Sequence, residues 1–280
     1  MNSPSRVLII GGTHGNEWTG IKIIEHYQDY LKKKYPSLEL EFILANPEAH
    51  EMKVRYKDED LNRAFQYLNE QRSSYESQRA HEIFNLITKS PCFVIDLHTT
   101  TANMGNTLIV SHYNALNLDL CGRVGKNYPL CRVIGAPDPS RKYLVSQSDF
   151  GLMIEVGPVA NNIVSAPQLE SMLTILEGIL TELSNGLRAQ PGSIELFEEA
   201  QDIYHLKDAK GTISTYIHSS FQGSDFQKIH GKFIPLKAFS GEEIELETTE
   251  ELYPIFINEA AYYPQQLAFT LCRKKQLIYK

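Results

Sequence analysis

Two side chains near the start of the chain have the types and spacing of metal ligands. His14 and Glu17 lie three residues apart, directly after the apolar run 7–10 and the pair Gly11-Gly12. An apolar run followed by glycines predicts a buried strand that ends in a sharp turn. If a helix starts there, residues three apart point the same way, and an imidazole and a carboxylate together suit zinc. A solvated helix start is the plain alternative for this motif.

His98 supplies a third donor for the same site. It follows the largely apolar run 92–97, which also predicts a buried strand. Because the carboxyl ends of parallel strands meet at one edge of a sheet, His98 can lie beside His14 and Glu17. Two histidines and one glutamate leave a position open for water, which is the pattern of a hydrolytic zinc site. Asp96, two residues earlier, can orient an imidazole through a hydrogen bond.

Glu155 is a candidate proton carrier, and a polar stretch supplies candidate cations. Glu155 is the one acid in the apolar run 152–158, where an isolated carboxylate is costly unless it has a partner or a chemical role. Desolvation would raise its pKa towards the range of a general base. Arg55 and Arg63, with Asn62 beside it, suit carboxylate binding and oxyanion stabilisation. A salt-bridged glutamate and solvated arginines are the alternatives.

The elements that must position these residues change in character along the chain. Predicted strands are at 6–11, 38–45, 92–98, 107–111, 130–135 and 152–158, and predicted helices at 17–34, 74–89, 115–127 and 167–185. This alternation predicts parallel βαβ units with helices on both faces of a sheet. The stretch 46–72 is polar and irregular, which predicts a loop. After about residue 190, short β-rich runs replace the helical periodicity and predict a second, mostly β domain.

Composition excludes several other classes of protein. The net charge of −7 argues against a nucleic-acid surface, and no apolar run is long enough to span a bilayer. The N-terminus has no signal-peptide pattern, and the four cysteines form no CxxC pair, so we expect free thiols and a cytoplasmic protein. A nucleotide-binding module fails because the glycine-rich turn lacks GxGxxG spacing. No GxSxG serine-hydrolase motif occurs, and Asn85 stands where an HExxH motif needs its second histidine.

Five motifs together resemble one known family. They are Gly11-Gly12-Thr13-His14-Gly15-Asn16-Glu17, Arg55 with Asp60-Leu61-Asn62-Arg63, Asp96-Leu97-His98-Thr99-Thr100, Ile154-Glu155-Val156-Gly157-Pro158 and Asn258-Glu259-Ala260-Ala261-Tyr262-Tyr263. In this order they resemble the aspartoacylase and succinylglutamate desuccinylase family of zinc amidohydrolases. The resemblance implies an α/β, zinc-carboxypeptidase-like domain over 1–188, with a central mixed, mostly parallel sheet flanked by helices. It also implies a smaller, mostly β domain over 189–280 that caps the active-site cleft.

The resemblance assigns a role to each matching residue. It implies one zinc ion per subunit, a general acid/base, an arginine that polarises the scissile carbonyl, and groups that hold the substrate's carboxylates. The implied zinc ligands are His14, Glu17 and His98; the catalytic residues are Glu155 and Arg55; and the substrate contacts are Arg55, Asn62, Arg63, Glu155 and Tyr262. Since Tyr262 belongs to the second domain, we expect the site to lie between the two domains.

The implied reaction is hydrolysis of an N-acyl amino acid, first of all N-acetyl-L-aspartate and water to acetate and L-aspartate. Two cations that family members use for the aspartate side chain are missing here: the stretch 143–148 has no arginine, and Gln265 and Gln266 stand where a lysine is expected. Arg141 and Lys142 are possible substitutes. An N-acetyl-aromatic amino acid deacetylase and a metallocarboxypeptidase-like peptidase are the alternatives. We expect a small-molecule partner, neither nucleic acid nor a membrane, and a homo-oligomer stays open.

Overall fold

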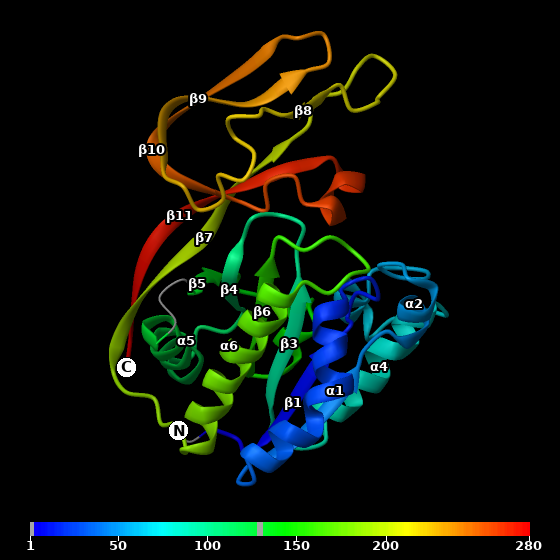
Figure 1. Cartoon of the computed structure of the whole chain (residues 1–280), viewed down its shortest axis with the longest axis vertical. Coiled ribbons are helices and arrows are strands. Elements are labelled where there is room, and N and C mark those ends of the chain that lie inside the picture. Colours follow the sequence, from blue (N-terminus) through cyan, green and yellow to red (C-terminus); the bar gives the residue numbers. More distant parts are fainter. Residues whose placement is uncertain (1–2, 128–130) are drawn as a thin grey trace.

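The computed structural model describes residues 3–127 and 131–280, which form one continuous mixed sheet with helices around its lower part (Figure 1). The strands are β1 Arg6–Gly11, β2 Glu39–Leu44, β3 Phe93–Thr99, β4 Gly105–Val110, β5 Cys131–Gly135, β6 Phe150–Gly157, β7 Gly192–Tyr204, β8 Thr215–Ile217, β9 Ile229–Ala238, β10 Glu243–Ile255 and β11 Leu267–Tyr279. The α-helices are α1 Trp18–Lys34, α2 Pro47–Met52, α3 Leu61–Ala64, α4 Tyr75–Thr88, α5 Ala115–Asn127 and α6 Ala166–Ser184, with 3-10 turns η1 Phe65–Tyr67, η2 Val145–Gln147 and η3 Ala260–Gln265.

The sheet has the strand order β2-β1-β3-β6-β4-β5-β7-β11-β10-β9-β8. Strands β2, β1, β3 and β6 run parallel, β4 is antiparallel to β6, and β5 is parallel to β4. The predicted α/β class with a mixed, mostly parallel sheet is confirmed. Of the predicted strand 130–135, residue 130 lies outside the described part of the chain.

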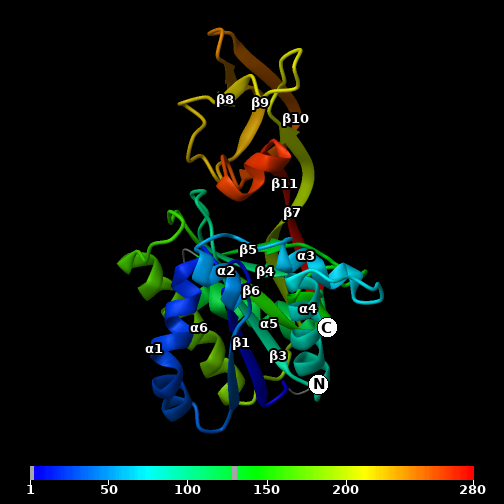
Figure 2. The same ribbon diagram turned by 90° about the vertical axis from the view of Figure 1, so that its right-hand side faces the viewer.

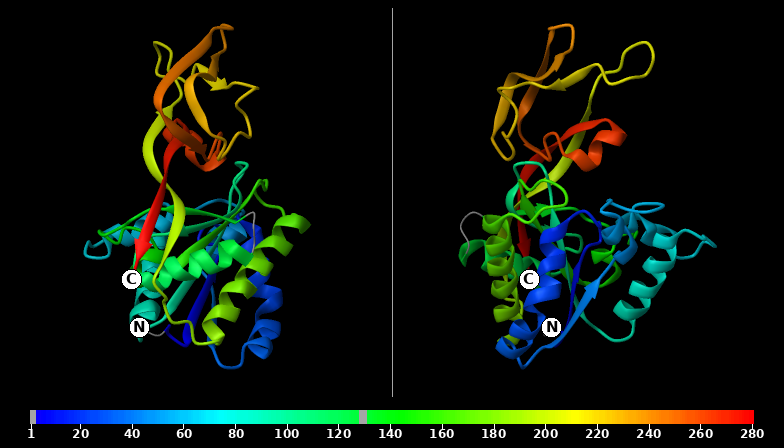
Figure 3. Two further views of the ribbon diagram at one scale, coloured as in Figure 1. Left: turned by 90° about the vertical axis from the view of Figure 1, so that its left-hand side faces the viewer. Right: turned by 45° about the vertical axis from the view of Figure 1, so that its right-hand side comes forward.

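Helices cover both faces of the lower sheet because its strands alternate their apolar side chains. Val7 and Ile9 of β1 pack in a core with α1, α5 and α6, whereas Leu8 and Ile10 pack in a second core with α4. Figure 3 shows the sheet between these two layers, with α4 in cyan on the side away from α1 and α6. Strands buried on both faces read as continuous apolar runs, which is why the sequence revealed them. Among the described residues, no helix is both long and apolar enough to cross a membrane.

The stretch 46–72, expected to be a loop, contains two short helices. The side chain of Asn46 accepts a hydrogen bond from the backbone N–H of Ala49 and caps α2, while Asp60 accepts from Asn62 N–H and caps α3. Capping side chains stabilise helices too short to show a hydrophobic period, so periodicity alone could not reveal them.

The region after residue 190 is built on longer strands than the sequence suggested. Strands β7, β10 and β11 have 13 residues each, and β7 and β11 rise from the lower sheet into an upper β lobe that contains β8, β9 and most of β10 (Figure 2). Charged residues interrupt their apolar pattern, but they pair across strands, as Lys274 does with Glu195 at 2.7 Å. No break in the sheet marks residue 188, so the two-domain division stays a prediction.

Close contact between α1 and β3 sets the edge of the sheet where the sequence placed the site. A Cβ atom added at Gly20 of α1 would lie 2.8 Å from Leu97 Cβ and 2.9 Å from the Leu97 carbonyl oxygen of β3. Gly12 has φ +69°, which lets the chain turn after β1 before α1 begins. These two glycines bring Glu17, at the start of α1, against the end of β3.

We predict that Gly20→Ala destabilises the protein although alanine is the better helix former. Overpacking against β3 costs about 1–3 kcal/mol, more than the roughly 0.5–1 kcal/mol gained from helix propensity. Gly122→Ala in α5 is the matched control, because the one described atom that its Cβ would approach is the Tyr279 hydroxyl, at 3.5 Å. Urea unfolding should show a loss of stability for Gly20→Ala and a gain for Gly122→Ala; equal gains would contradict the packing argument.

Candidate active site

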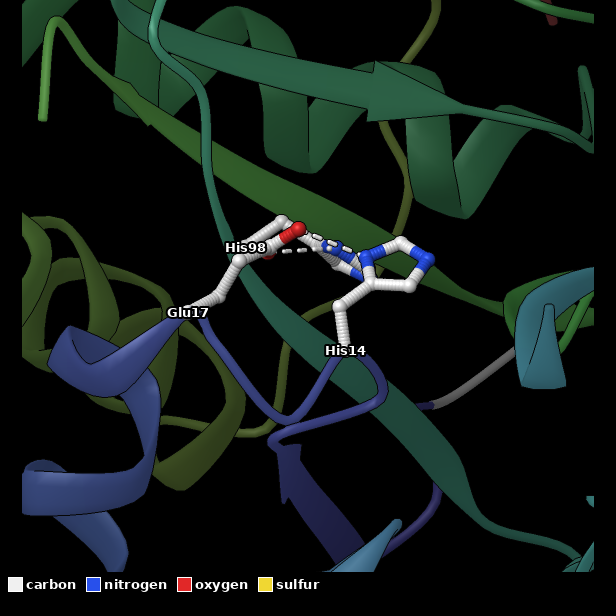
Figure 4. Close-up of side chains that lie close together, drawn as sticks. All are labelled: His14, Glu17 and His98. Carbon is white, nitrogen blue, oxygen red and sulfur yellow. Dashed lines mark hydrogen bonds and ion pairs between the residues drawn. The ribbon is translucent and has the colours of Figure 1, made fainter. Parts of the chain in front are cut away.

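Two histidines and one glutamate meet at the carboxyl edge of the sheet (Figure 4). His14 lies in the turn after β1, Glu17 directly precedes α1, and His98 lies near the end of β3. Glu17 Oε1 is 2.6 Å from His14 Nδ1, and Glu17 Oε2 is 3.0 Å from His98 Nδ1. All three residues are buried, and one ligand atom from each lies within 4.8 Å of the other two. The structure therefore brings the three expected metal ligands into one cluster.

In each of the two histidines, the Nε2 atom contacts a further carboxylate. His98 Nε2 is 2.7 Å from Asp96 Oδ2, as expected from the sequence, and Asp96 Oδ1 accepts a hydrogen bond from Thr13 Oγ1 at 2.8 Å. His14 Nε2 is 3.2 Å from Asp60 Oδ1. Such carboxylates fix the orientation of an imidazole ring and leave its other nitrogen free for a metal. The two Nδ1 atoms, which both face Glu17, are thus the nitrogens available to an ion.

The charges in the cluster suit a bound cation. Burial opposes ionisation of Glu17, but His14 and His98 outweigh it, so the pKa of this carboxyl is well below its ordinary value. Burial also opposes protonation of His98, yet Asp96 and Glu17 raise the pKa of this imidazole well above its ordinary value. The cluster therefore favours positive charge between the carboxylates, and a metal ion would displace a proton from it. Two imidazoles and one carboxylate match the donor set of zinc.

Arg55 lies against the same cluster. Its Nη1 donates to Glu17 Oε1 at 3.1 Å, and its Nη2 lies 2.8 Å from His14 Nε2 and 3.5 Å from Asp60 Oδ2. Burial would lower the pKa of Arg55, but the carboxylates of Glu17 and Asp60 raise it above its ordinary value. The guanidinium is therefore a fixed positive charge beside the cluster, where it can stabilise negative charge that develops on a substrate.

Glu155 faces the cluster from the neighbouring strand. In the parallel register of β3 and β6 it pairs with His98. Its side chain is buried, and Oε1 has no hydrogen-bond partner among the described residues. Burial is the main reason why the pKa of this carboxyl is well above its ordinary value, and the charges of Glu17 and Glu259 raise it further. An unsatisfied buried carboxyl is costly, so it indicates that a partner such as water or substrate belongs there.

The eight residues to which the resemblance gives a role as metal ligand, catalytic residue or substrate contact all line one cavity of about 440 Å³. They are His14, Glu17, Arg55, Asn62, Arg63, His98, Glu155 and Tyr262. Asn62 also has a structural contact, because its Oδ1 accepts a hydrogen bond from Leu144 N–H at 3.0 Å. Within the described part of the chain, the Arg63 side chain has no hydrogen bond or ion pair, so it is free to bind an anion. Tyr262 also lines the cavity and belongs to η3, which lies in the upper part of the molecule, in red (Figure 2).

Arg141 does not replace the missing side-chain cation. Its Nη1 donates to the carbonyl oxygens of Ser146 and Gln147, each at 3.0 Å, and its Nη2 pairs with Asp149. Of the described residues, neither Arg141 nor Lys142 lines the cavity. The suggestion from the sequence that Arg141 or Lys142 replaces the missing cation is therefore wrong.

Glu259 is a site residue to which the sequence gave no role. One of its oxygens accepts hydrogen bonds from Thr101 N–H at 2.7 Å and Ala102 N–H at 3.2 Å, just after β3. The other oxygen accepts from Ala261 N–H at 2.9 Å and caps η3. This buried carboxylate therefore fixes η3, and with it Tyr262, over the end of β3. Its place in a matching motif was the one signal for it.

Glu76 of α4 holds the loop that carries the arginines. It is fully buried, and its carboxylate accepts hydrogen bonds from three consecutive backbone N–H groups and from the amide of Asn46 at 3.1 Å. The backbone donors are Lys57 at 2.7 Å, Asp58 at 3.0 Å and Glu59 at 3.3 Å. A glutamate in a helix pattern gives no sign of such a role, so sequence reasoning missed it.

The structure thus combines a mixed α/β sheet with a buried His-Glu-His cluster, an adjacent arginine and a buried carboxyl that has an oxygen without a partner among the described residues. Residues 3–183 match the family model of the succinylglutamate desuccinylase/aspartoacylase catalytic domain, and residues 192–274 match the AstE/AspA barrel-sandwich hybrid domain. The chain therefore belongs to the succinylglutamate desuccinylase/aspartoacylase family.

Relatives of more than one specificity resemble the chain over nearly its whole length. A probable aspartoacylase from Nostoc sp. is 35% identical, and the match covers 99% of both chains. An N-acyl-aromatic-L-amino acid amidohydrolase from Xenopus laevis is 33% identical and covers 97% of this chain and 95% of its own. The crystal structure of murine aminoacylase 3 superposes with a TM-score of 0.90 at 29% identity, over 98% of this chain and 96% of that one.

We predict that Glu76→Ala destabilises the protein by at least about 2 kcal/mol, because it leaves buried donors without an acceptor. Glu82→Ala on the same helix is the control, since the Glu82 side chain is 60% exposed. Thermal and urea unfolding should separate the two variants. Equal stability of both would show that Glu76 does not hold the loop.

Proposed function

We propose that the chain is a zinc-dependent amidohydrolase that splits an N-acyl amino acid into a carboxylate and the free amino acid. The observation that carries this proposal is the buried cluster of His14, Glu17 and His98 with the unpartnered Glu155 carboxyl opposite. Family membership supports the reaction class, because the relatives named above hydrolyse N-acyl amino acids according to their names.

Glu155 is the proposed proton carrier of the reaction. When bound by the three ligands, zinc would supply a Lewis acid that makes water nucleophilic near neutral pH. Glu155 accepts a proton from the attacking water and later passes it to the nitrogen of the leaving amine. Its burial suits the first step, because a carboxylate with a raised pKa is a stronger base and takes a proton from water more readily than an exposed one does. The products are a carboxylate and an amino acid.

Arg55 and Arg63 are proposed to bind two different negative charges, the oxyanion and the α-carboxylate. We propose that Arg55 stabilises the oxyanion that forms at the acyl carbon, and its contacts with Glu17 and His14 support this role. The proposed role of Arg63 is to hold the α-carboxylate, and its side chain has no partner among the described residues. Asn62 and the Tyr262 hydroxyl complete the proposed substrate contacts.

The side-chain specificity of the enzyme is the open part of the proposal. The sequence resemblance puts N-acetyl-L-aspartate first, and that substrate needs a second cation for its side-chain carboxylate. Among the described residues that line the cavity there is no lysine, and no arginine besides Arg55 and Arg63. Ile109, Ile134 and Met153 form an apolar part of the wall. This favours an N-acyl amino acid with a single carboxylate, such as the N-acetyl-aromatic class.

Replacement of His14 and of Glu155 should have different effects. His14→Ala should lose the metal, whereas Glu155→Gln should keep it and lower kcat by about 10²–10⁴-fold, the usual contribution of a positioned proton carrier. Metal analysis and kinetics of both variants test this, with the exposed His26→Ala of α1 as the control. Full zinc occupancy in His14→Ala would contradict the ligand assignment, and loss of zinc in Glu155→Gln would make Glu155 a ligand or a structural residue.

A substrate panel tests the proposed reaction directly. We expect hydrolysis of N-acetyl-L-tyrosine above that of N-acetyl-L-aspartate, loss of activity with a zinc chelator, and recovery on adding zinc back. A faster reaction with N-acetyl-L-aspartate would overturn the argument from the cavity wall and favour the aspartoacylase activity that the sequence resemblance implies. Cleavage of a C-terminal dipeptide alone would favour the peptidase alternative.

A further inference from the structure

The cavity wall has an acidic side that the proposed reaction does not use. Glu198 and Glu199 follow one another in β7, and both line the cavity. Glu198 accepts a hydrogen bond from the Tyr113 hydroxyl at 3.0 Å and pairs with Lys275, so its charge is compensated. The Glu199 side chain has neither a hydrogen bond nor an ion pair with any other described residue. One carboxylate on this wall is therefore free to meet a ligand.

β7 is irregular directly after the two acidic residues. Glu199 pairs with Cys272 of β11 and Gln201 pairs with Leu271, so Ala200 is an extra residue in β7. Such a bulge bends its strand and is common beside active sites. Glu199 thus lies next to a bend in the strand that joins the lower sheet to the β lobe.

Glu199 lies close enough to two tyrosines of the cavity to affect their ionisation. Burial is the main cause of the raised pKa values of Tyr143 and Tyr262, and the negative charge of Glu199 raises both further. All three residues line the cavity, and burial also raises the pKa of the Glu199 carboxyl, a shift that a bound cation would oppose. Aromatic rings and a carboxylate both attract cations.

Part of the remaining wall is apolar, and the free positive charge belongs to Arg63. Apolar lining residues include Ile109, Ile134, Val145, Met153 and Phe256. Arg55 is paired with Glu17 and Asp60 beside the proposed metal ligands, which leaves Arg63 for the α-carboxylate. A side chain with an aliphatic stem and a cationic end would bury its stem on the apolar wall and bring its charge to Glu199. A second carboxylate would meet like charge instead.

We propose that Glu199 makes the site selective for N-acyl amino acids whose side chain ends in a cation, of the lysine type. This inference rests on the proposed amidohydrolase function and specifies its substrate class. Glu199 acts on selectivity through charge, so it should change the ratio between charged and neutral substrates without changing the reaction itself.

The test compares Nα-acetyl-L-lysine with Nα-acetyl-L-norleucine, which has a similar stem without the charge. With the zinc-loaded enzyme, kcat/KM should be higher for the lysine substrate, and added salt should reduce the difference. Glu199→Gln should lower the lysine-to-norleucine ratio about fivefold, the size of a partly exposed ion pair. Glu199→Lys should raise kcat/KM for N-acetyl-L-aspartate about tenfold. Glu195→Gln, on the same strand but outside the cavity, should leave the lysine-to-norleucine ratio and the kcat/KM for N-acetyl-L-aspartate unchanged.

Each result separates this inference from the proposed function. Hydrolysis of the norleucine substrate with an unchanged ratio in Glu199→Gln would overturn the role of Glu199 and leave the amidohydrolase intact. A preference for norleucine over lysine in the unmodified enzyme would do the same. Failure to hydrolyse any N-acyl amino acid would overturn the proposed function and this inference together. Unfolding curves and zinc content, measured for every variant, ensure that a lost ratio reflects charge and not misfolding.

Discussion

The site depends on one carboxylate, that of Glu17, which bridges two segments far apart in the sequence. Its two oxygens reach the imidazoles of His14 and His98, and Oε2 also accepts the backbone N–H of Thr99 at 2.9 Å. A buried carboxylate is tolerated only with such partners. The contact between α1 and β3 at Gly20 holds these groups at bonding distance, so the local backbone packing and the donor cluster depend on each other.

Beyond this cluster, the cavity is assembled by carboxylates that each bind several backbone N–H groups. Glu76 organises the loop that carries Arg55 and Arg63, and Glu259 fastens η3 to the chain after β3. Ionised acceptors bind N–H donors about twice as strongly as neutral ones do. Loops that would otherwise move are therefore held at the edge of the sheet, and the arginines and Tyr262 meet the cluster in fixed positions.

The sequence predicted the elements with a clear hydrophobic pattern and the residues whose types suit chemistry. Buried strands such as β1 and β3 appear as apolar runs, and His14, Glu17, His98 and Glu155 stand out because polar groups at the ends of such runs are unusual. Their roles stay predictions, although the structure brings them to one cavity. The roles of Glu76 and Glu259 could not be predicted, because each depends on backbone groups brought near only by the fold. The length of β7 was missed because its alternating charges look like loop composition in one strand alone.

The ribbon of β7 and β11 has a consequence for how the chain folds. The end of β11 returns to the lower sheet, where Tyr279 is buried in the same core as Val7 and Ile9 and its hydroxyl lies 3.3 Å from Asp119. Between β7 and that return, the chain makes the whole β lobe, including η3. Among the described strands, β11 emerges last from the ribosome, and it completes the core to which β1, the first, contributes. During synthesis, the residues of the donor cluster emerge before Glu259 and Tyr262, so the cavity receives this part of its wall late.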